Sequence, residues 1–263
     1  MILKDKIIWV TGASSGIGEA VVKAYAAAGA KVVLSARNST SLNQIKNKLL
    51  NPDKCLVVPL DLADSSSIAK AVTIIIDAFG TVDILINNGG ISQRSLVNET
   101  PLEIDRRVME VNFFGTIALT KAVLPYMEKQ KSGHIATVSS VVGLFGFPLR
   151  SAYSSSKHAL HGFFESLALE QYKNNIHVTI VCPGRVKTNI SINAITKDGS
   201  KHGVMDHGQN DGITAESCAN QIVKSIQKRK RLVLIGGKET FLARIKRISP
   251  WAYFKIALKV NPI

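Results

Sequence analysis

Tyr153 and Lys157 are the residues of this chain whose types and spacing could do acid/base chemistry. Side chains four residues apart on a helix project from one face, so the phenol and the ammonium would be neighbours. Free tyrosine titrates near pH ~10 and a nearby positive charge favours the phenolate, so we expect Lys157 to lower the pKa of Tyr153. The pair is a candidate general acid/base. Taken alone, the spacing also fits an ordinary amphipathic helix with a packed ring and a solvated ammonium.

A glycine-rich segment, residues 11–18, follows the first apolar run and leads into a helical pattern. Glycines are needed where backbone and phosphate approach closely, and helix N-terminal amides bind a pyrophosphate. The spacing differs from the common G-x-G-x-x-G form, and a simple tight turn would also explain the cluster. The residues expected to contact a cofactor here are Gly12, Ser14, Ser15, Gly16, Ile17 and Gly18.

Short apolar runs alternate with helical patterns along the chain. Strands are predicted over residues 7–10, 31–35, 55–60, 83–87, 134–139, 177–182 and 232–235. Strands that are apolar on both faces and separated by helices predict a parallel sheet covered on both sides. We therefore expect an α/β fold, a doubly wound Rossmann-like parallel sheet of about seven strands with helices on both faces. Its ligand crevice would lie at the carboxyl ends of the strands.

The residues after the second and third predicted strands indicate which dinucleotide binds. Where a carboxylate would hydrogen-bond the ribose of NAD, the chain has Arg37. Arg37 can pair with a 2′-phosphate, which favours NADP(H) over NAD(H), although it could also be a solvated loop cation. Asp61 and Leu62 lie where the adenine edge is expected. Asp61 could equally cap the next helix.

Between about residues 5 and 235 the chain resembles the short-chain dehydrogenase/reductase family. Five signals appear in family order: the glycine loop, Asn-Asn-x-Gly at 87–90, Ser140, Tyr-x-x-x-Lys at 153–157 and Pro183-Gly184. The spacing from Ser140 to Tyr153 is also the family's, which favours Ser140 over Ser139 as the catalytic serine. Residues 191–206 look like the dehydrogenase/reductase member-seven branch, which is close to enzymes acting on steroids and other lipid-like ketones.

The resemblance implies four catalytic residues. Tyr153 would give its proton to a carbonyl oxygen while a nicotinamide delivers hydride, and Ser140 would hydrogen-bond that oxygen. Lys157 would bind the nicotinamide ribose, and Asn112 would hold a water that connects the lysine to solvent. Locally, Asn112 could equally be a buried amide bonded to backbone.

The resemblance implies further cofactor contacts. Gly89 stands where the family usually has alanine, and we expect it to loosen the turn without blocking the cofactor. Thr188 matches the residue that binds the nicotinamide carboxamide. The implied contacts are Asn88, Gly89, Tyr153, Lys157, Pro183, Gly184, Val186 and Thr188.

The expected function is an NADP(H)-dependent oxidoreductase that interconverts a ketone or aldehyde and an alcohol, with a lipid-like or steroid-like substrate. The alternative is a non-catalytic, cofactor-sensing interaction protein on the same fold. Such a protein would be expected to lack Tyr153 or Lys157, and both are present. By analogy with the family, a homodimer or homotetramer would form through helices at about residues 112–129 and 152–172.

The net charge of +14 is concentrated near the C-terminus, because residues 221–263 contain eleven Lys or Arg and one acid, a net +10. We expect one catalytic domain over residues 1–237, including a substrate loop at 189–213, and a basic amphipathic extension over 238–263. The extension could lie on an anionic membrane or pack on the domain or another subunit, and Pro250 should divide it.

Other classes lack support in the sequence. Three widely spaced cysteines, Cys55, Cys182 and Cys218, make neither a disulfide frame nor a zinc site, and we expect no metal. No nucleic-acid-binding motif accompanies the basic charge, so we expect no specific nucleic acid partner. No signal-peptide pattern and no apolar run of roughly 20 residues occurs, which predicts a cytoplasmic protein, at most peripheral to a membrane.

Overall fold

A computed structural model describes residues 3–259. Seven parallel strands form one sheet in the order β3-β2-β1-β4-β5-β6-β7. The strands are β1 (Ile7–Thr11), β2 (Lys31–Ser35), β3 (Cys55–Val57), β4 (Ile84–Asn87), β5 (Gly133–Val138), β6 (Ile176–Pro183) and β7 (Leu232–Ile235). The predicted doubly wound fold is confirmed. The strand order reverses between β1 and β4, so the crevice expected of this fold lies where these two strands end.

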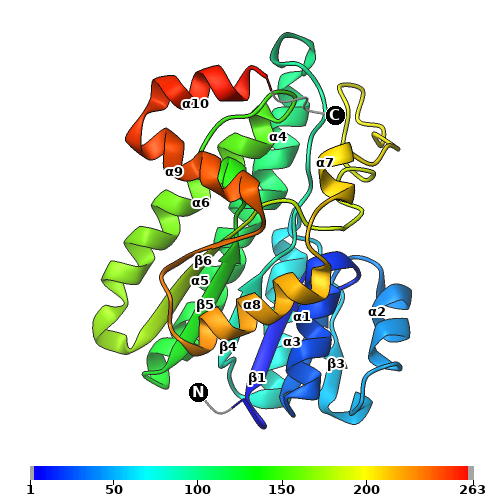
Figure 1. The fold of residues 1–263 in the computed structure, drawn as a ribbon. Coiled ribbons are helices and arrows are strands. Elements are labelled where there is room, and N and C mark those ends of the chain that lie inside the picture. Colours follow the sequence, from blue (N-terminus) through cyan, green and yellow to red (C-terminus); the bar gives the residue numbers. More distant parts are fainter. Residues whose placement is uncertain (1–2, 260–263) are drawn as a thin grey trace.

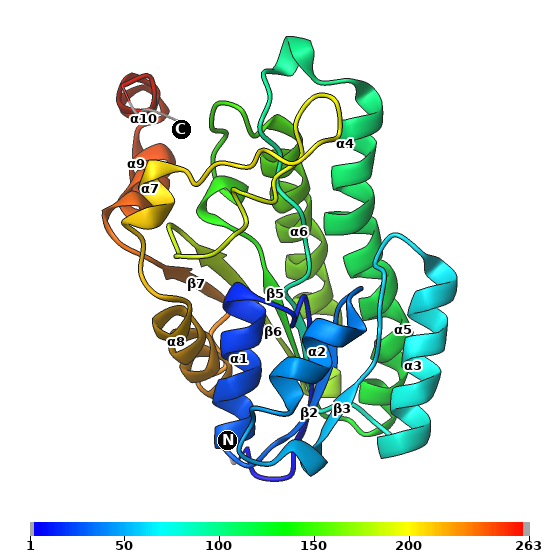
Figure 2. The same ribbon diagram turned by 90° about the vertical axis from the view of Figure 1, so that its right-hand side faces the viewer.

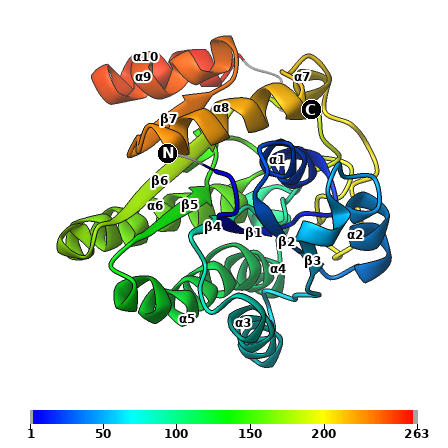
Figure 3. The same cartoon turned by 90° about the horizontal axis from the view of Figure 1, so that it is seen from below.

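Helices cover both faces of the sheet (Figures 1 and 3). The helices α1 (Gly16–Ala27) and α8 (Ala215–Gln227) pack together on one face, and α3 (Ser65–Phe79), α5 (Gly115–Lys129) and α6 (Ser151–Glu170) cover the other. The remaining helices are α2 (Ser39–Lys46), α4 (Leu102–Met109), α7 (His207–Asn210), α9 (Phe241–Ile248) and α10 (Pro250–Ala257).

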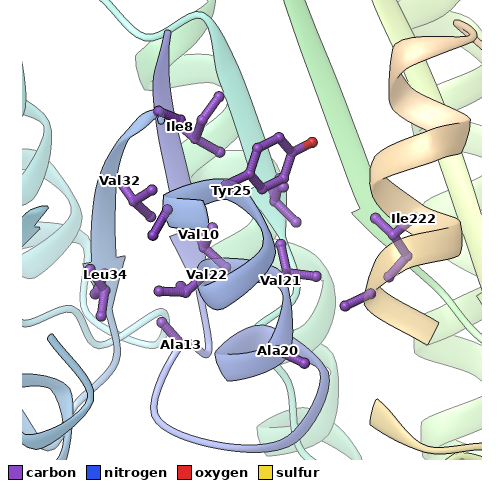
Figure 4. Packing of buried hydrophobic residues seen from close by; sticks show 14 of the residues in the cluster. Ile8, Val10, Ala13, Ala20, Val21, Val22, Tyr25, Val32, Leu34 and Ile222 are labelled. Carbon is purple, nitrogen blue, oxygen red and sulfur yellow. The ribbon is translucent and has the colours of Figure 1, made fainter. Parts of the chain in front are cut away.

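Each face of the sheet has its own apolar core. On the α1 face, Ile8 and Val10 of β1 pack against Val21 and Tyr25 of α1, and Ile222 of α8 completes the cluster (Figure 4). The core on the opposite face is built around Trp9 and Leu85. Because neighbouring residues of β1 enter opposite cores, the central strand has no polar face, as the continuous apolar run predicts.

The C-terminal segment forms a helical hairpin near the carboxyl edge of the sheet (Figure 2). The α9 helix ends at Ile248 and α10 begins at Pro250, so the predicted break at this proline is confirmed. The inner side of the hairpin packs on residues 141–147, where Ala243 and Tyr253 contact Phe145. The inner side of the hairpin therefore packs on the domain, which is one of the arrangements expected for the extension.

A buried histidine makes the stability of the fold depend on pH. His134 in β5 is 0% exposed, and its Nε2 shares a 2.8 Å hydrogen bond with Thr179 Oγ1. Burial, followed by repulsion from His177 and Arg229, lowers the pKa of His134 to about 3. The folded pKa lies below the unfolded value of ~6.5, so stability present above that pH is lost as the pH falls.

The free energy of unfolding of the wild type should fall between about pH 6.5 and about pH 5. We predict that this fall is smaller in His134→Asn, by up to roughly 2 kcal/mol, because no buried imidazole then takes up a proton on unfolding. Urea denaturation at the two pH values measures the difference. The exposed His207→Asn is the matched control. An unchanged pH dependence in His134→Asn would contradict the assignment.

Candidate active site

A cavity of about 210 Å³ opens at the carboxyl edge of the sheet. Its walls come from the ends of β4, β5 and β6, the first turns of α6 and the segment after β6. Nine predicted site residues line it: Ile17, Asn88, Ser140, Tyr153, Lys157, Pro183, Gly184, Val186 and Thr188. Three of the four predicted catalytic residues therefore face one cavity.

Tyr153 and Lys157 lie four residues apart on α6, as predicted, with the lysine Nζ 5.7 Å from the centroid of the tyrosine ring. Lys157 is buried, and its Nζ donates a 2.8 Å hydrogen bond to the carbonyl of Val138. Burial lowers the pKa of Lys157 to about 8, because desolvation disfavours the ammonium. The lysine can therefore exchange a proton near neutral pH.

The pKa of Tyr153 differs from our expectation. Burial of the tyrosine raises its pKa, and this effect outweighs a side-chain hydrogen bond with Ser140 and the charges of Arg94 and Arg150, which lower it. The expectation that the pKa is lowered, with Lys157 as the cause, was therefore wrong for this structure. A buried phenol is penalised for ionising, so enclosure of the hydroxyl decides the direction.

Ser140 follows β5, at the end of the same sheet edge. Its Oγ donates a 3.3 Å hydrogen bond to the carbonyl of Pro183 and accepts one from the amide of Val142. Ser139 also lines the cavity, but its Oγ contacts His161 Nε2 at 3.0 Å and the Lys157 carbonyl at 3.1 Å. These contacts support a structural role for Ser139.

Asn112 does not line the cavity and is fully buried in a π-helical turn, Glu110–Phe114, between α4 and α5. Its amide exchanges hydrogen bonds of 2.8 and 2.9 Å with the backbone of Ile91 and donates one of 3.0 Å to Ser156 Oγ. The local alternative, a buried amide bonded to backbone, thus describes its contacts. Single π-helical turns inside α-helices occur frequently at functional sites.

Hydrogen bonds join the glycine loop to the end of β4. The Asn88 side chain donates to the Thr11 carbonyl at 3.0 Å and to the Gly12 carbonyl at 3.3 Å. Gly12 has a φ of +63°, which favours glycine, and a Cβ on Gly18 would lie 2.2 Å from the Gly12 carbonyl oxygen. These glycines are therefore required by the compact path of the loop.

Gly89 packs closely against Leu62. A Cβ at this position would lie 2.8 Å from Leu62 Cδ1 and 3.3 Å from Thr11 Oγ1. Because Leu62 Cδ1 is the far end of a flexible side chain, a small movement of Leu62 would make room for an alanine methyl group. The packing therefore does not require glycine here, and the looser turn stays a prediction.

The other predicted cofactor residues lie outside the cavity lining. Arg37 is exposed, two residues after β2, and the glycine loop is tied to this strand by the 3.1 Å hydrogen bond from Ala13 N to Ser35 O. Asp61 accepts a hydrogen bond from Ala63 N, whereas Asp64 caps α3. The suggested helix cap at Asp61 was therefore wrong. The other predicted cofactor residues that do not line the cavity are Gly12, Ser14, Ser15, Gly16, Gly18, Leu62 and Gly89.

Sequence reasoning missed five charged residues of the cavity, which are Arg94, Arg150, Arg185, Asp206 and Glu239. Of these, Arg94, Arg150 and Asp206 are each more than nine-tenths buried. Asp206 Oδ2 accepts 2.6 Å hydrogen bonds from Arg94 Nη2 and Arg150 Nη2. A signal existed for Arg150, which precedes Tyr153 by three residues and shares its side of the helix start.

Within residues 3–259, no group of three or more His, Cys, Asp or Glu side chains could hold a metal ion. Cys55, Cys182 and Cys218 are all buried free thiols. None of the helices in this part of the chain is long and apolar enough to cross a bilayer.

Sequence comparison places these features in a known context. The profile of the short chain dehydrogenase family matches residues 6–199. The mouse protein named dehydrogenase/reductase SDR family member 7B is 42% identical over 260 residues, which cover 97% of this chain and 80% of the mouse protein. A Drosophila melanogaster protein named dehydrogenase/reductase SDR family protein 7-like is 41% identical and covers 98% of this chain and 81% of its own length.

Solved structures agree with the sequence matches. A short-chain dehydrogenase from Streptomyces avermitilis superposes with a TM-score of 0.84 at 29% identity, covering 99% of this chain and 100% of that one. A short chain dehydrogenase/reductase from Burkholderia phymatum in complex with NAD has a TM-score of 0.81 at 23% identity, covers 100% of this chain and 98% of its own, and shares the fold. With a family profile over most of its length, this chain belongs to the short-chain dehydrogenase/reductase family of oxidoreductases.

Proposed function

We propose that this protein is an NADP(H)-dependent oxidoreductase that interconverts a ketone or aldehyde and an alcohol. The observation that supports this function best is that Ser140, Tyr153 and Lys157 line one cavity beside the glycine loop. We assign the catalytic domain to residues 1–237, with a substrate loop at 189–213, and a basic extension to 238–263. Residues 1–2 and 260–263 of these ranges lie outside the described residues.

The residues at the sheet edge fit a dinucleotide. Gly12 and Gly16 have positive φ, and no Cβ can be placed on Gly12 or Gly18 without a close contact. The loop therefore exposes backbone and the N-terminal amides of α1, which can hold a pyrophosphate. At the nicotinamide end of the dinucleotide, the proposed contacts are Val186 and Thr188, which line the cavity. When bound, a nicotinamide cofactor would supply hydride to the carbonyl carbon.

The side chains of the cavity would handle the proton. Tyr153 gives its hydroxyl proton to the carbonyl oxygen, and Ser140 donates a hydrogen bond to that oxygen as negative charge develops. Lys157, whose pKa burial lowers to about 8, can return a proton to the phenolate. Asn112 positions the helix start by bonding Ser156 and the backbone of Ile91.

We predict that Tyr153→Phe lowers kcat for ketone reduction by roughly 10²-fold or more, because the proton donor is lost, while NADPH still binds. Absorbance at the NADPH band measures turnover, and fluorescence titration measures cofactor binding. Tyr172→Phe, at a tyrosine that is 74% exposed on the surface, is the control. Full activity of Tyr153→Phe would contradict the enzymatic function and favour the cofactor-sensing alternative.

Arg37 supports the preference for NADP(H). It is exposed at the edge where the glycine loop meets β2, and no acidic residue occupies residues 35–38. An arginine here can pair with the 2′-phosphate of the adenosine ribose, and a charge-assisted hydrogen bond contributes ~1.5–3 kcal/mol.

We predict that Arg37→Glu weakens NADPH binding by roughly tenfold to hundredfold and leaves NADH binding unchanged or stronger. Titration of both cofactors measures the ratio of dissociation constants. Lys48→Glu makes the same charge change at another exposed position and should not alter this ratio. Equal losses for NADPH and NADH in Arg37→Glu would reject the proposed 2′-phosphate contact.

The outer side of the hairpin supports peripheral contact with an anionic membrane. Phe241, Ile248, Trp251, Phe254 and Leu258 are each more than half exposed. Cations lie among them, and Lys255 Nζ stacks 3.7 Å from the centroid of the Trp251 ring. Apolar residues beside Lys and Arg are typical of helices that lie in the headgroup region. We propose a cytoplasmic protein whose hairpin touches such a surface.

We predict that the double variant Trp251→Ser/Phe254→Ser binds vesicles containing anionic lipid at least tenfold more weakly than the wild type. Cosedimentation with phosphatidylserine vesicles measures this binding, and phosphatidylcholine vesicles test the role of charge. Leu169→Ser removes an apolar side chain that is 74% exposed on α6 and serves as the control. If the double variant and the wild type bind equally, the membrane contact is rejected.

We also propose a homodimer or homotetramer by analogy with the family. The helices involved would be α5 and α6. Light scattering in solution measures the number of subunits, and a monomer would reject this assembly.

A further inference from the structure

Asp206 joins three segments of the chain at the cavity wall. Its Oδ2 accepts 2.6 Å hydrogen bonds from Nη2 of both Arg94 and Arg150, and its Oδ1 accepts one of 3.3 Å from Arg94 Nε. Arg94 lies between β4 and α4, Arg150 directly precedes α6, and Asp206 lies in the loop of residues 189–213. The carboxylate therefore connects this loop to the start of the helix that carries Tyr153.

A second set of contacts joins the same three segments. Ile195 of the loop donates a 2.8 Å backbone hydrogen bond to the Ser92 carbonyl and accepts one of 2.9 Å from the amide of Arg94. Between these two residues, the fully buried Gln93 accepts a 2.9 Å hydrogen bond on Oε1 from the amide of Ala152. The segment that carries Arg94 thus contacts the loop on one side and α6 on the other.

These contacts supply partners that the first turn of α6 lacks within the helix. The first amides of a helix have no intrahelical acceptor and need one from outside. Arg150 stands at the N-cap of α6 and makes no side-chain cap. The Ala152 amide is bonded by Gln93 instead, and the Arg150 guanidinium is bonded by Asp206. Because Tyr153 is the next residue after Ala152, its position depends on these external contacts.

The bonds of Asp206 are charged and buried. Burial would raise the pKa of Asp206, but the hydrogen bond and charge of Arg94, together with Arg150, lower it, so the carboxylate is ionised. Removing one partner of a buried ion pair is strongly destabilising, because the other charge stays buried. An exposed pair, Lys197 with Glu99 at 3.6 Å, also joins the loop to the segment after β4, but exposed pairs contribute little. Asp206 is therefore the charged residue that holds the loop.

We propose that Asp206 is a positioning residue of the reaction. It binds Arg94 and Arg150, holds the 189–213 loop against the start of α6, and so keeps the Tyr153 hydroxyl placed for proton transfer. An error of about 1 Å in the placement of a catalytic group can cost roughly 10²-fold in rate. This inference rests on the oxidoreductase function proposed above and adds a residue to it.

Steady-state kinetics of Asp206→Asn test this role. NADPH oxidation by the full chain is measured with the most rapidly reduced member of a panel of aliphatic, cyclic and steroid ketones. We expect kcat to fall by roughly tenfold to hundredfold, because Tyr153 is no longer held in place, while the dissociation constant of NADPH is unchanged. If Asp206 only shapes the cavity wall, KM rises and kcat equals that of the wild type. That result would overturn the inference and leave the oxidoreductase function intact.

Two control variants separate positioning from a general loss of stability. Glu99→Gln breaks the exposed pair that joins the same loop to the segment after β4, and it should leave kcat and KM unchanged. Asp83→Asn breaks a partly buried pair with Lys6 at the opposite edge of the sheet. It should lower the urea midpoint of unfolding without lowering kcat. An equal loss of kcat in Asp83→Asn and Asp206→Asn would mean that destabilisation alone explains the effect, and would reject the positioning role.

Hydrogen exchange of the full chain with NADPH bound needs no turnover. In the wild type, the amides of Arg94, Ala152 and Ile195 should be protected to a similar degree, because one junction holds all three. In Asp206→Asn, all three should exchange at least roughly tenfold faster, and unchanged exchange would overturn the inference. The wild type alone decides if the variant folds poorly or no ketone is reduced. Exchange of Ile195 more than roughly tenfold faster than that of Ala152 would mean that the loop opens without α6, which also overturns it.

Discussion

The reversal of strand order between β1 and β4 is the constraint on which the rest of the structure depends. All seven strands are parallel, so the residues that follow them meet at one edge. At the reversal, Asn88 bonds the carbonyls of Thr11 and Gly12, and Thr11 Oγ1 accepts from the amides of Asn88 and Gly89. These bonds hold the glycine loop against β4. A shift of either strand would move the loop away from the cavity that α6 completes.

Desolvation governs the chemistry of the cavity. It raises the pKa of Tyr153 and lowers that of Lys157 to about 8, so both side chains are driven toward their neutral forms. The free side chains have nearly equal pKa values, so burial moves the pKa of the tyrosine and that of the lysine apart. Ser140, Arg94 and Arg150 oppose the effect on the tyrosine. Positive charge from outside the helix therefore acts on Tyr153 in addition to any effect of Lys157.

The cavity connects these groups to the C-terminal hairpin. Leu242 of α9 forms part of its wall, and Ala243 and Tyr253 pack on the turn that carries Val141 and Phe145. The opposite side of the same hairpin exposes Trp251 and other apolar residues among cations. One small element thus contributes to the apolar side of the cavity and to the exposed basic surface.

The sequence by itself determined the parallel α/β fold, the glycine loop and the placement of Ser140, Tyr153 and Lys157, because these depend on short-range patterns: apolar runs, glycine positions and a four-residue helical spacing. Only the tertiary structure decided the pKa direction of Tyr153, the contact of Leu62 with Gly89 and the buried cluster of Arg94, Arg150 and Asp206. Asp206 lies 112 residues from Arg94 and 56 from Arg150, and Leu62 reaches Gly89 from another strand end. Burial and contacts between distant segments leave no pattern in a short stretch of sequence. They arise only when the folded chain brings those segments together.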